Sequence, residues 1–200
     1  MERIRLFFFL AALATLLSVG TAAPSHPDLD FIRVSCRSTR YPALCESSLS
    51  GYASTVHRSP RQLAHAALAV TLARARSASA FVGRLGGGGG GERAARRSRE
   101  AGAVQDCIEN VGDSVDRLRR SAAEMGRMGR AGSSGFAWHL SNVQTWVSAA
   151  LTDETTCLDG FAGRNIDPRL RAAVRRQIVG LAQVTSNALA LVNRIPLPRH

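Results

Sequence analysis

The sequence contains no lysine: all 26 of its basic residues are arginine, against only 15 aspartate and glutamate residues. The formal net charge of +11 favours acidic partners, such as an acidic cell-wall polysaccharide or the acidic face of a protein. The same charge is equally compatible with a solvated surface that only keeps the protein soluble. Aromatic residues make up 6% of the chain, and none is interleaved with the arginine runs. Nucleic-acid binding is therefore not expected.

The chain also lacks the residue patterns of common catalytic and metal sites. Its five histidines are scattered, and no two share a helix face at the spacing of metal ligands. There is no Gly-x-Ser-x-Gly nucleophile motif. The run of six glycines at 86–91 has neither a preceding strand nor a following Gly-Lys-Ser/Thr segment. We therefore expect no enzyme activity, no catalytic residue, no metal and no cofactor.

Long hydrophobic runs are absent except near the start of the chain. Two arginines, an apolar run at 6–17 and small residues at 20–22 are typical of a secretory signal peptide. The apolar run is shorter than the roughly 20 residues that span a bilayer. We predict a signal peptide at 1–22, a flexible leader at 23–29, and a secreted, extracellular protein without a membrane anchor.

The four cysteines occur in two contrasting settings. Cys36 and Cys45 are nine positions apart, which suits only a local bridge. Cys107 and Cys157 are 50 positions apart, and each lies in a long stretch with helical apolar periodicity. In a secreted chain this spacing suggests two disulfides, one closing a short hairpin and one clamping two helices together.

Capping residues and apolar periodicity predict four long helices, and no segment shows the period of two that is typical of a strand. Pro60 after Ser59, and Pro168 after Asp167, are typical of helix starts. Glycine has the largest entropy cost on ordering, so we expect the run 86–91 to be a flexible loop. The long helices are expected at 59–85, 92–128, 135–161 and 168–195.

Two shorter helices are expected before the long ones, at 30–37 and 41–53, with the first disulfide joining them. The predicted fold is all-α: an antiparallel up-down-up-down four-helix bundle preceded by a short N-terminal helical hairpin, with two disulfides. The predicted domain spans 30–195, comprising the hairpin at 30–53 and the bundle at 59–195. A tail is expected at 196–200.

Three interpretations concern burial. The carboxylates Asp153, Glu154 and Asp159 are interpreted as part of a solvated, salt-paired surface. Asn187, beside the apolar stripe of the fourth helix, is interpreted as a satisfied buried amide that fixes register. The second helix is expected to bury an apolar stripe with spacings of four and three, and Cys107 flanks this stripe. Its members are Val104, Ile108, Val111, Val115, Leu118, Ala122 and Met125.

Several segments resemble the plant invertase and pectin methylesterase inhibitor family, over residues from about 30 to 193. The most specific segment is SNVQTWVSAALTDETTCLDGF at 141–161. The others are the hairpin residues Cys36, Thr39-Arg40-Tyr41-Pro42, Cys45 and Ser48-Leu49, then Asp106-Cys107, Asp113-Ser114-Val115-Asp116, Leu118, and Ser186-Asn187-Ala188-Leu189-Ala190. The likeness is to the small stand-alone members, described as 21-kDa proteins. It implies a helical hairpin before a four-helix bundle, and the same cysteine pairing that the spacing suggests.

The resemblance implies reversible one-to-one binding over the substrate cleft of an enzyme in the cell wall. Pectin methylesterase is the predicted partner, because the family's invertase inhibitors are described as using a Pro-Lys-Phe tripeptide that a chain without lysine cannot contain. Acid invertase, of the cell wall or the vacuole, is the alternative target. The partner-binding residues suggested around the third helix are Asn142, Thr145, Thr156 and Asp159; each is equally compatible with an ordinary exposed helix position.

Two further hypotheses stay open. One is that the protein is a basic wall protein that its charge holds on acidic pectin, without an enzyme partner. The other is that pH tunes binding through His65 or His139, because histidine titrates near the pH of the wall. We expect a monomer.

Overall fold

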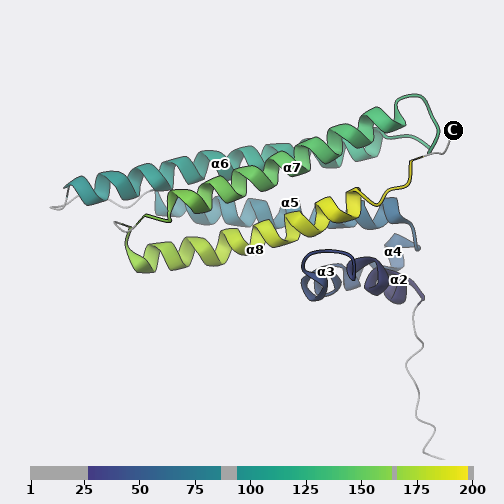
Figure 1. Cartoon of the computed structure of the whole chain (residues 1–200), viewed down its shortest axis with the longest axis horizontal. Helices are drawn as coiled ribbons and strands as arrows, with labels where there is room; N and C mark the ends of the chain where they lie inside the picture. Colours follow the sequence, from purple (N-terminus) through teal and green to yellow (C-terminus); the bar gives the residue numbers. More distant parts are fainter. Residues whose placement is uncertain (1–26, 87–93, 164–165, 198–200) are drawn as a thin grey trace, which may run out of the picture.

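The computed structural model describes residues 27–86, 94–163 and 166–197 (Figure 1). The predicted signal peptide at 1–22 and most of the glycine run at 86–91 lie outside these residues. The described residues form helices and turns and contain no strand, which confirms the all-α prediction. The short elements are α2 (Pro27–Cys36), α3 (Pro42–Leu49), the 3-10 helix η2 (Ser50–Tyr52) and α4 (Ala53–Val56). The long helices are α5 (Pro60–Leu85), α6 (Ala94–Arg127), α7 (Phe136–Gly160) and α8 (Pro168–Val192).

Helices α5 and α8 begin where their capping residues predict. The Ser59 side chain accepts a hydrogen bond from the Gln62 backbone N–H at 3.3 Å, and Pro60 follows it. The Asp167 carboxylate accepts from the backbone N–H groups of Arg169 and Leu170 at 2.8 and 3.1 Å. These bonds satisfy donors that have no partner inside the helix.

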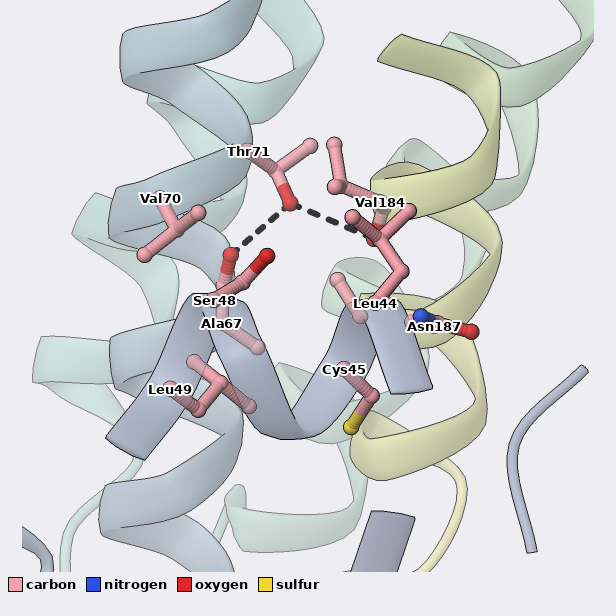
Figure 2. Close-up of a pocket in the computed structure, with 10 residues that line it drawn as sticks. Leu44, Cys45, Ser48, Leu49, Ala67, Val70, Thr71, Val184 and Asn187 are labelled. Carbon is pink, nitrogen blue, oxygen red and sulfur yellow. Dashed lines mark hydrogen bonds between the residues drawn. The ribbon is translucent and has the colours of Figure 1, made fainter. Parts of the chain in front are cut away.

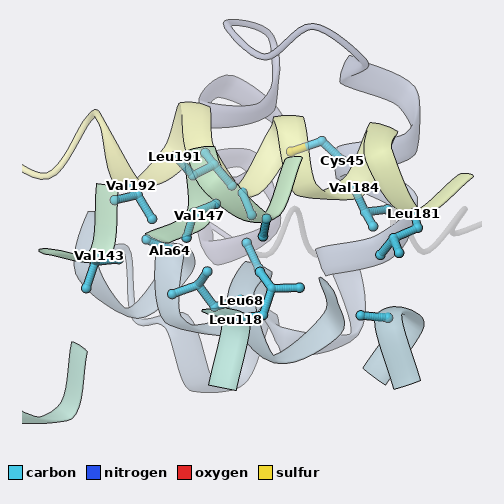
Figure 3. Close-up of a cluster of buried hydrophobic side chains, with 14 of the residues drawn as sticks. Cys45, Ala64, Leu68, Leu118, Val143, Val147, Leu181, Val184, Leu191 and Val192 are labelled. Atoms are coloured by element: carbon cyan, nitrogen blue, oxygen red, sulfur yellow. The ribbon is translucent and has the colours of Figure 1, made fainter. Parts of the chain in front are cut away.

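Helices α5 to α8 run alternately up and down and form the predicted bundle (Figure 1). Each packs against two neighbours: α5 against α6 and α8, and α7 against α6 and α8. Side chains from all four meet in the core, where Figure 3 shows Leu68, Leu118, Val147 and Leu181. Each of these four side chains is fully buried, and such burial stabilises a fold by about 1.5–3 kcal/mol per side chain.

The helical hairpin formed by α2 and α3 packs against α5 and α8 near the end of α8. A disulfide joins Cys36 to Cys45 within it. Asn187 of α8 is 4% exposed; its Oδ1 accepts from the Tyr41 N–H at 3.0 Å, and its Nδ2 donates to the Tyr41 carbonyl at 2.9 Å. Asn187 is thus a satisfied buried amide, and what it holds in place is the hairpin. Figure 2 shows the crevice at this contact, which is too small for a ligand.

Three predicted boundaries differ from the structure. The leader predicted at 23–29 is helical from Pro27, because proline suits the first helical position and Asp28 and Asp30 interact favourably with the helix dipole. The fourth helix ends at Val192, because Pro196 has no N–H to donate to the Val192 carbonyl and its ring would clash with that carbonyl in a helix. Ile195 is nevertheless buried. The second short helix, predicted at 41–53, is interrupted after Leu49 by η2.

The buried stripe of α6 also differs from the prediction. Ile108, Val115 and Ala122 are only half-buried. Cys107 lies within the stripe rather than beside it. Two serines take buried positions because their hydroxyl groups have hydrogen-bond partners within the bundle. The buried residues are Val104, Cys107, Val111, Ser114, Leu118, Ser121, Glu124 and Met125.

Candidate functional site

Helix α7 is the one long helix of the bundle without an arginine. Its sequence from Phe136 to Gly160 contains no arginine, whereas α5 has four, α6 has seven and α8 has four. In a chain with a net charge of +11, this helix therefore presents a distinct surface.

The outward side of α7 carries hydroxyl groups. Thr152 donates to the Ser148 carbonyl at 3.2 Å, and Thr156 donates to the Thr152 carbonyl at 2.9 Å, so these side chains lie along their own helix. Covering a hydroxyl group that keeps a hydrogen bond costs less solvation energy than covering an unpaired charge. The exposed hydroxyl residues are Ser141, Thr145, Ser148, Thr152, Thr155 and Thr156. We call these six residues the hydroxyl face.

The structure places three of the four residues suggested for partner binding on this side of α7. Thr145 and Thr156 are exposed and 11 residues apart, which brings them to within about 20° of each other around the helix axis. Asp159 is exposed one turn further on. Asn142 is half-buried instead, and its Nδ2 donates to Glu124 Oε1 of α6 at 2.9 Å.

Two shallow grooves flank the hydroxyl face. The groove between α7 and α8 includes Thr145, and the groove between α6 and α7 includes Thr156 and Asp159 beside the second disulfide. The remaining residues of the first groove are Gln144, Ser148, Ala149, Thr152, Leu189 and Asn193, none of which is charged. A partner that covers α7 therefore meets an uncharged groove on one side and carboxylates on the other.

The start of α7 is held against α6 by a buried carboxylate. The Glu124 side chain is 3% exposed and accepts from Asn142, while His139 Nδ1 lies 2.8 Å from Glu124 Oε1 and Arg127 lies 3.3 Å from Oε2. These contacts, the Asn142 hydrogen bond first and then His139, lower the pKa of Glu124. Of the two histidines in the pH hypothesis, His139 thus contacts a carboxylate, whereas His65 is exposed on α5.

The end of α7 is joined to α6 by a disulfide and an ion pair. Cys107 and Cys157 are bonded, with their Cα atoms 4.4 Å apart, and both are buried. Arg117 Nε donates to Asp153 Oδ2 at 2.7 Å. Burial raises the pKa of Asp153, although the hydrogen bond from Arg117 acts in the opposite direction. Both ends of α7 are therefore fixed by contacts on its inner side.

Glu154 lies in the core, so its interpretation as a solvated surface residue is wrong. Its side chain is fully buried, and Oε1 accepts from Ser114 Oγ of α6 at 2.8 Å and from Thr185 Oγ1 of α8 at 2.9 Å. Oε2 has no hydrogen-bond partner in the described part of the chain. Burial raises the pKa of Glu154 to about 8, so the carboxyl group is neutral in acid. The sequence spacing could have predicted this burial, because Glu154 is four residues after the buried Ala150 and three before the buried Cys157.

Within 27–86, 94–163 and 166–197, no cluster of three or more histidine, cysteine, aspartate or glutamate residues is suitable for a metal ion. In the same ranges, every helix is too short or too polar to cross a membrane.

Comparisons with known proteins agree with the arrangement of a helical hairpin, a four-helix bundle and two disulfides. Residues 30–191 match the family model described as "Plant invertase/pectin methylesterase inhibitor". The chain is 48% identical over 183 residues to the "21 kDa protein" of Daucus carota, covering 92% of this chain and 91% of that protein. It is 47% identical over 192 residues to "Pectinesterase inhibitor 9" of Arabidopsis thaliana, covering 94% of this chain and 92% of that protein.

The fold is similar to a solved structure, the crystal structure of mutant form A of a pectin methylesterase inhibitor from Arabidopsis. The TM-score is 0.62 at 21% sequence identity, covering 82% of this chain and 95% of that one. The family match at 30–191 includes most of the hairpin, all four cysteines and the whole of α7. On this evidence the chain belongs to the plant invertase/pectin methylesterase inhibitor family.

Proposed function

We propose that this protein inhibits a pectin methylesterase by binding the enzyme through the hydroxyl face of α7. The observation that carries the proposal is the absence of arginine from α7 in a chain of net charge +11, within a family of inhibitors. Several relatives, "Pectinesterase inhibitor 9" among them, are named for this activity. The family comprises inhibitor proteins rather than enzymes, so the protein acts by binding.

Inhibition follows from covering the enzyme's substrate cleft rather than from chemistry. The inner side of α7 is held by Glu124, by the Arg117–Asp153 ion pair and by the Cys107–Cys157 disulfide. Little conformational entropy is lost when a surface that is already rigid meets its partner, so more of the interaction energy is available for affinity. Thr145, Thr156 and Asp159 are the contacts we propose, in a reversible one-to-one complex. Asn142 acts through Glu124, as a positioning residue.

The site of action we propose is the cell wall. The family is extracellular. We propose that residues 1–22 direct secretion of this chain and that it acts there as a monomer.

The test is a parallel inhibition assay of the purified, oxidised protein against plant pectin methylesterases and acid invertase. We expect near-equimolar protein to suppress methyl-ester hydrolysis and to leave invertase activity unchanged. Reduced protein and an unrelated arginine-rich protein of similar charge are the controls. If the protein inhibits acid invertase and no pectin methylesterase, the proposed target is wrong and invertase is the target.

A second candidate interaction is attraction to acidic pectin, favoured by the net charge of +11. It predicts retention on de-esterified pectin without an enzyme present. Such retention should weaken as salt concentration rises and screens the charges.

A further inference from the structure

Arginines gather at the end of the bundle that lies away from the hairpin. Helices α5 and α7 end here and α6 and α8 begin here, opposite the hairpin in Figure 1. The arginines come from the last turn of α5, the start of α6 and the first three turns of α8. They are Arg84, Arg99, Arg169, Arg171, Arg175 and Arg176. We call these six residues the arginine end.

Most of these side chains are exposed and have no ion-pair or hydrogen-bond partner among the described residues. Elsewhere in the molecule several arginines pair with carboxylates, as Arg117 does with Asp153 at 2.7 Å and Arg119 with Asp116 at 2.9 Å. At the arginine end, Arg171 donates to backbone carbonyl groups of the preceding loop. The side chains of the other five make no ion pair or hydrogen bond with any described residue.

The carboxylates nearby do not neutralise this end. Glu100 accepts from the Asp167 backbone N–H at 2.8 Å, and the Asp167 carboxylate caps α8. Asp159 lies with Asp106 and Glu109 in the groove between α6 and α7, whereas four of the five exposed guanidinium groups lie on α5 and α8. The surface therefore has a surplus of positive charge that its own residues leave available.

The chemistry of this surface fits a flexible polyanion better than a protein. The centre of a protein interface is dehydrated, and burying several unpaired guanidinium groups there is costly unless the partner supplies a matching carboxylate for each. The exposed large apolar side chains of the described residues are Val34 in the hairpin, Tyr52 in η2, Trp138 at the start of α7 and Leu197 after α8. None is at the arginine end. Guanidinium groups form paired hydrogen bonds with carboxylates, which an unesterified uronate chain carries in series.

We propose that the arginine end binds runs of uronate residues in de-esterified pectin. The proposal rests on the attraction to acidic pectin proposed above and names the surface responsible for it. Hydrolysis of a methyl ester consumes water, leaves a carboxylate on the polymer and releases methanol and a proton. The inhibitor is therefore concentrated where its target enzyme has already acted, with the hydroxyl face available on α7.

The experiment compares two triple variants of the full, oxidised chain. Arg169→Gln/Arg175→Gln/Arg176→Gln alters the arginine end. The matched control, Arg74→Gln/Arg76→Gln/Arg120→Gln, removes the same charge from exposed arginines in the middle of α5 and α6 that also have no described partner. Binding to polygalacturonate and to highly methyl-esterified pectin is measured over a salt series, with thermal unfolding to verify the fold. Enzyme binding is measured without polymer.

We expect the arginine-end variant to bind polygalacturonate about tenfold more weakly than the control variant, and esterified pectin to bind the wild type poorly. Equal weakening in both variants would overturn the proposal, because the attraction would then belong to the whole surface. Loss of enzyme binding with unchanged polymer binding would also overturn it and make this end a protein contact. No binding of polygalacturonate by the wild type would refute the general attraction as well. Inhibition of the enzyme is measured independently of all these outcomes.

Discussion

The hydroxyl face of α7 and the arginine end of the bundle differ in the kind of partner that each can accept. The hydroxyl face is uncharged and is backed by contacts that fix both ends of its helix. The arginine end consists of long charged side chains, most of which have no partner in the part of the chain that the structure describes. Burying a charge is costly unless it is paired, whereas a hydroxyl group bonded to its own helix costs little to cover.

This difference explains how one small bundle can have two separate interactions. A rigid, uncharged surface suits a close-fitting protein contact whose affinity depends on shape. A flexible, charged surface suits a polymer whose affinity depends on charge density and salt. The variants proposed below change the support, the charge or the edge of the hydroxyl face. Each is compared with a control variant in a region that should be unaffected.

The largest expected effect comes from removing the support beneath the end of α7. Cys107→Ala/Cys157→Ala should lower the free energy of unfolding by about 4 kcal/mol, because the disulfide closes a 50-residue loop. Cys36→Ala/Cys45→Ala removes a disulfide between residues nine positions apart and should lower the free energy of unfolding by roughly 2.5 kcal/mol. Denaturant unfolding measures both. A larger loss from the hairpin disulfide would contradict the view that the longer bridge is the main brace.

The pH dependence of stability tests the buried side of the same helix. The pKa of Glu154 is about 8 in the folded protein, above its unfolded value of about 4.3, so folding favours the protonated form. The stability that Glu154 contributes is therefore fully present at low pH. The free energy of unfolding should fall by about 1.4 kcal/mol per pH unit from about pH 5 to about pH 8. Glu154→Gln should remove most of this slope in unfolding curves measured at each pH.

Two neighbouring groups bear on this pH prediction. Asp153, whose pKa is also raised, adds a slope of the same sign, whereas Glu124, with its lowered pKa, contributes stability that is lost only as pH falls. Glu109→Gln, at an exposed position of α6, is the matched control and should leave the slope unchanged. If wild type and Glu154→Gln lose stability equally between pH 5 and pH 8, Glu154 is not the group responsible.

Adding positive charge to α7 should abolish the contrast between the two surfaces. Thr145→Arg/Thr156→Arg places two bulky charges on the hydroxyl face and should weaken inhibition of pectin methylesterase about 100-fold, or about 2.7 kcal/mol. Ala73→Arg/Ser77→Arg adds the same charge to exposed positions of α5 and should leave inhibition nearly unchanged. Inhibition constants and thermal unfolding are measured for both. Equal inhibition by both variants would remove α7 from the proposed interface.

The smallest effect concerns Asn142, at the edge of the hydroxyl face. Asn142→Ala removes a hydrogen bond to the buried Glu124 carboxylate and should lower the free energy of unfolding by about 1–2 kcal/mol. Because we place Asn142 as a positioning residue, inhibition should weaken only a few-fold. A loss similar to that of the double arginine variant, with unchanged stability, would make Asn142 a direct contact.

Local chemistry explains why the helices were predictable. Caps such as Ser59 and Asp167 act on the first turn of their own helix, and prolines restrict the residues beside them. The beginnings of α5 and α8 therefore lie within one residue of their predicted positions. The interruption after Leu49 and the early end of α8 were missed, because apolar residues such as Ile195 can be buried without being helical.

Burial of polar residues was not predictable in the same way. A search for apolar periodicity considers only apolar residues, so the polar residues Ser114 and Glu154 were not predicted to lie in the core. Both are buried, because they lie on the inward side of their helices. Their burial depends on a hydrogen bond between residues 40 positions apart. Asn142 was correctly assigned to the third helix, but its engagement with Glu124 required the position of a second helix.

By itself, the sequence determined that the chain is all-helical, where most helices begin, and which family it resembles, because hydrogen bonding within a helix and capping involve neighbours in the chain. Only the tertiary structure decided which polar side chains are buried, that Asn187 fastens the hairpin, and that the arginine-free helix and the arginine end form separate surfaces. The physical reason is that these contacts join residues far apart in the chain. Their geometry exists only after the helices have packed.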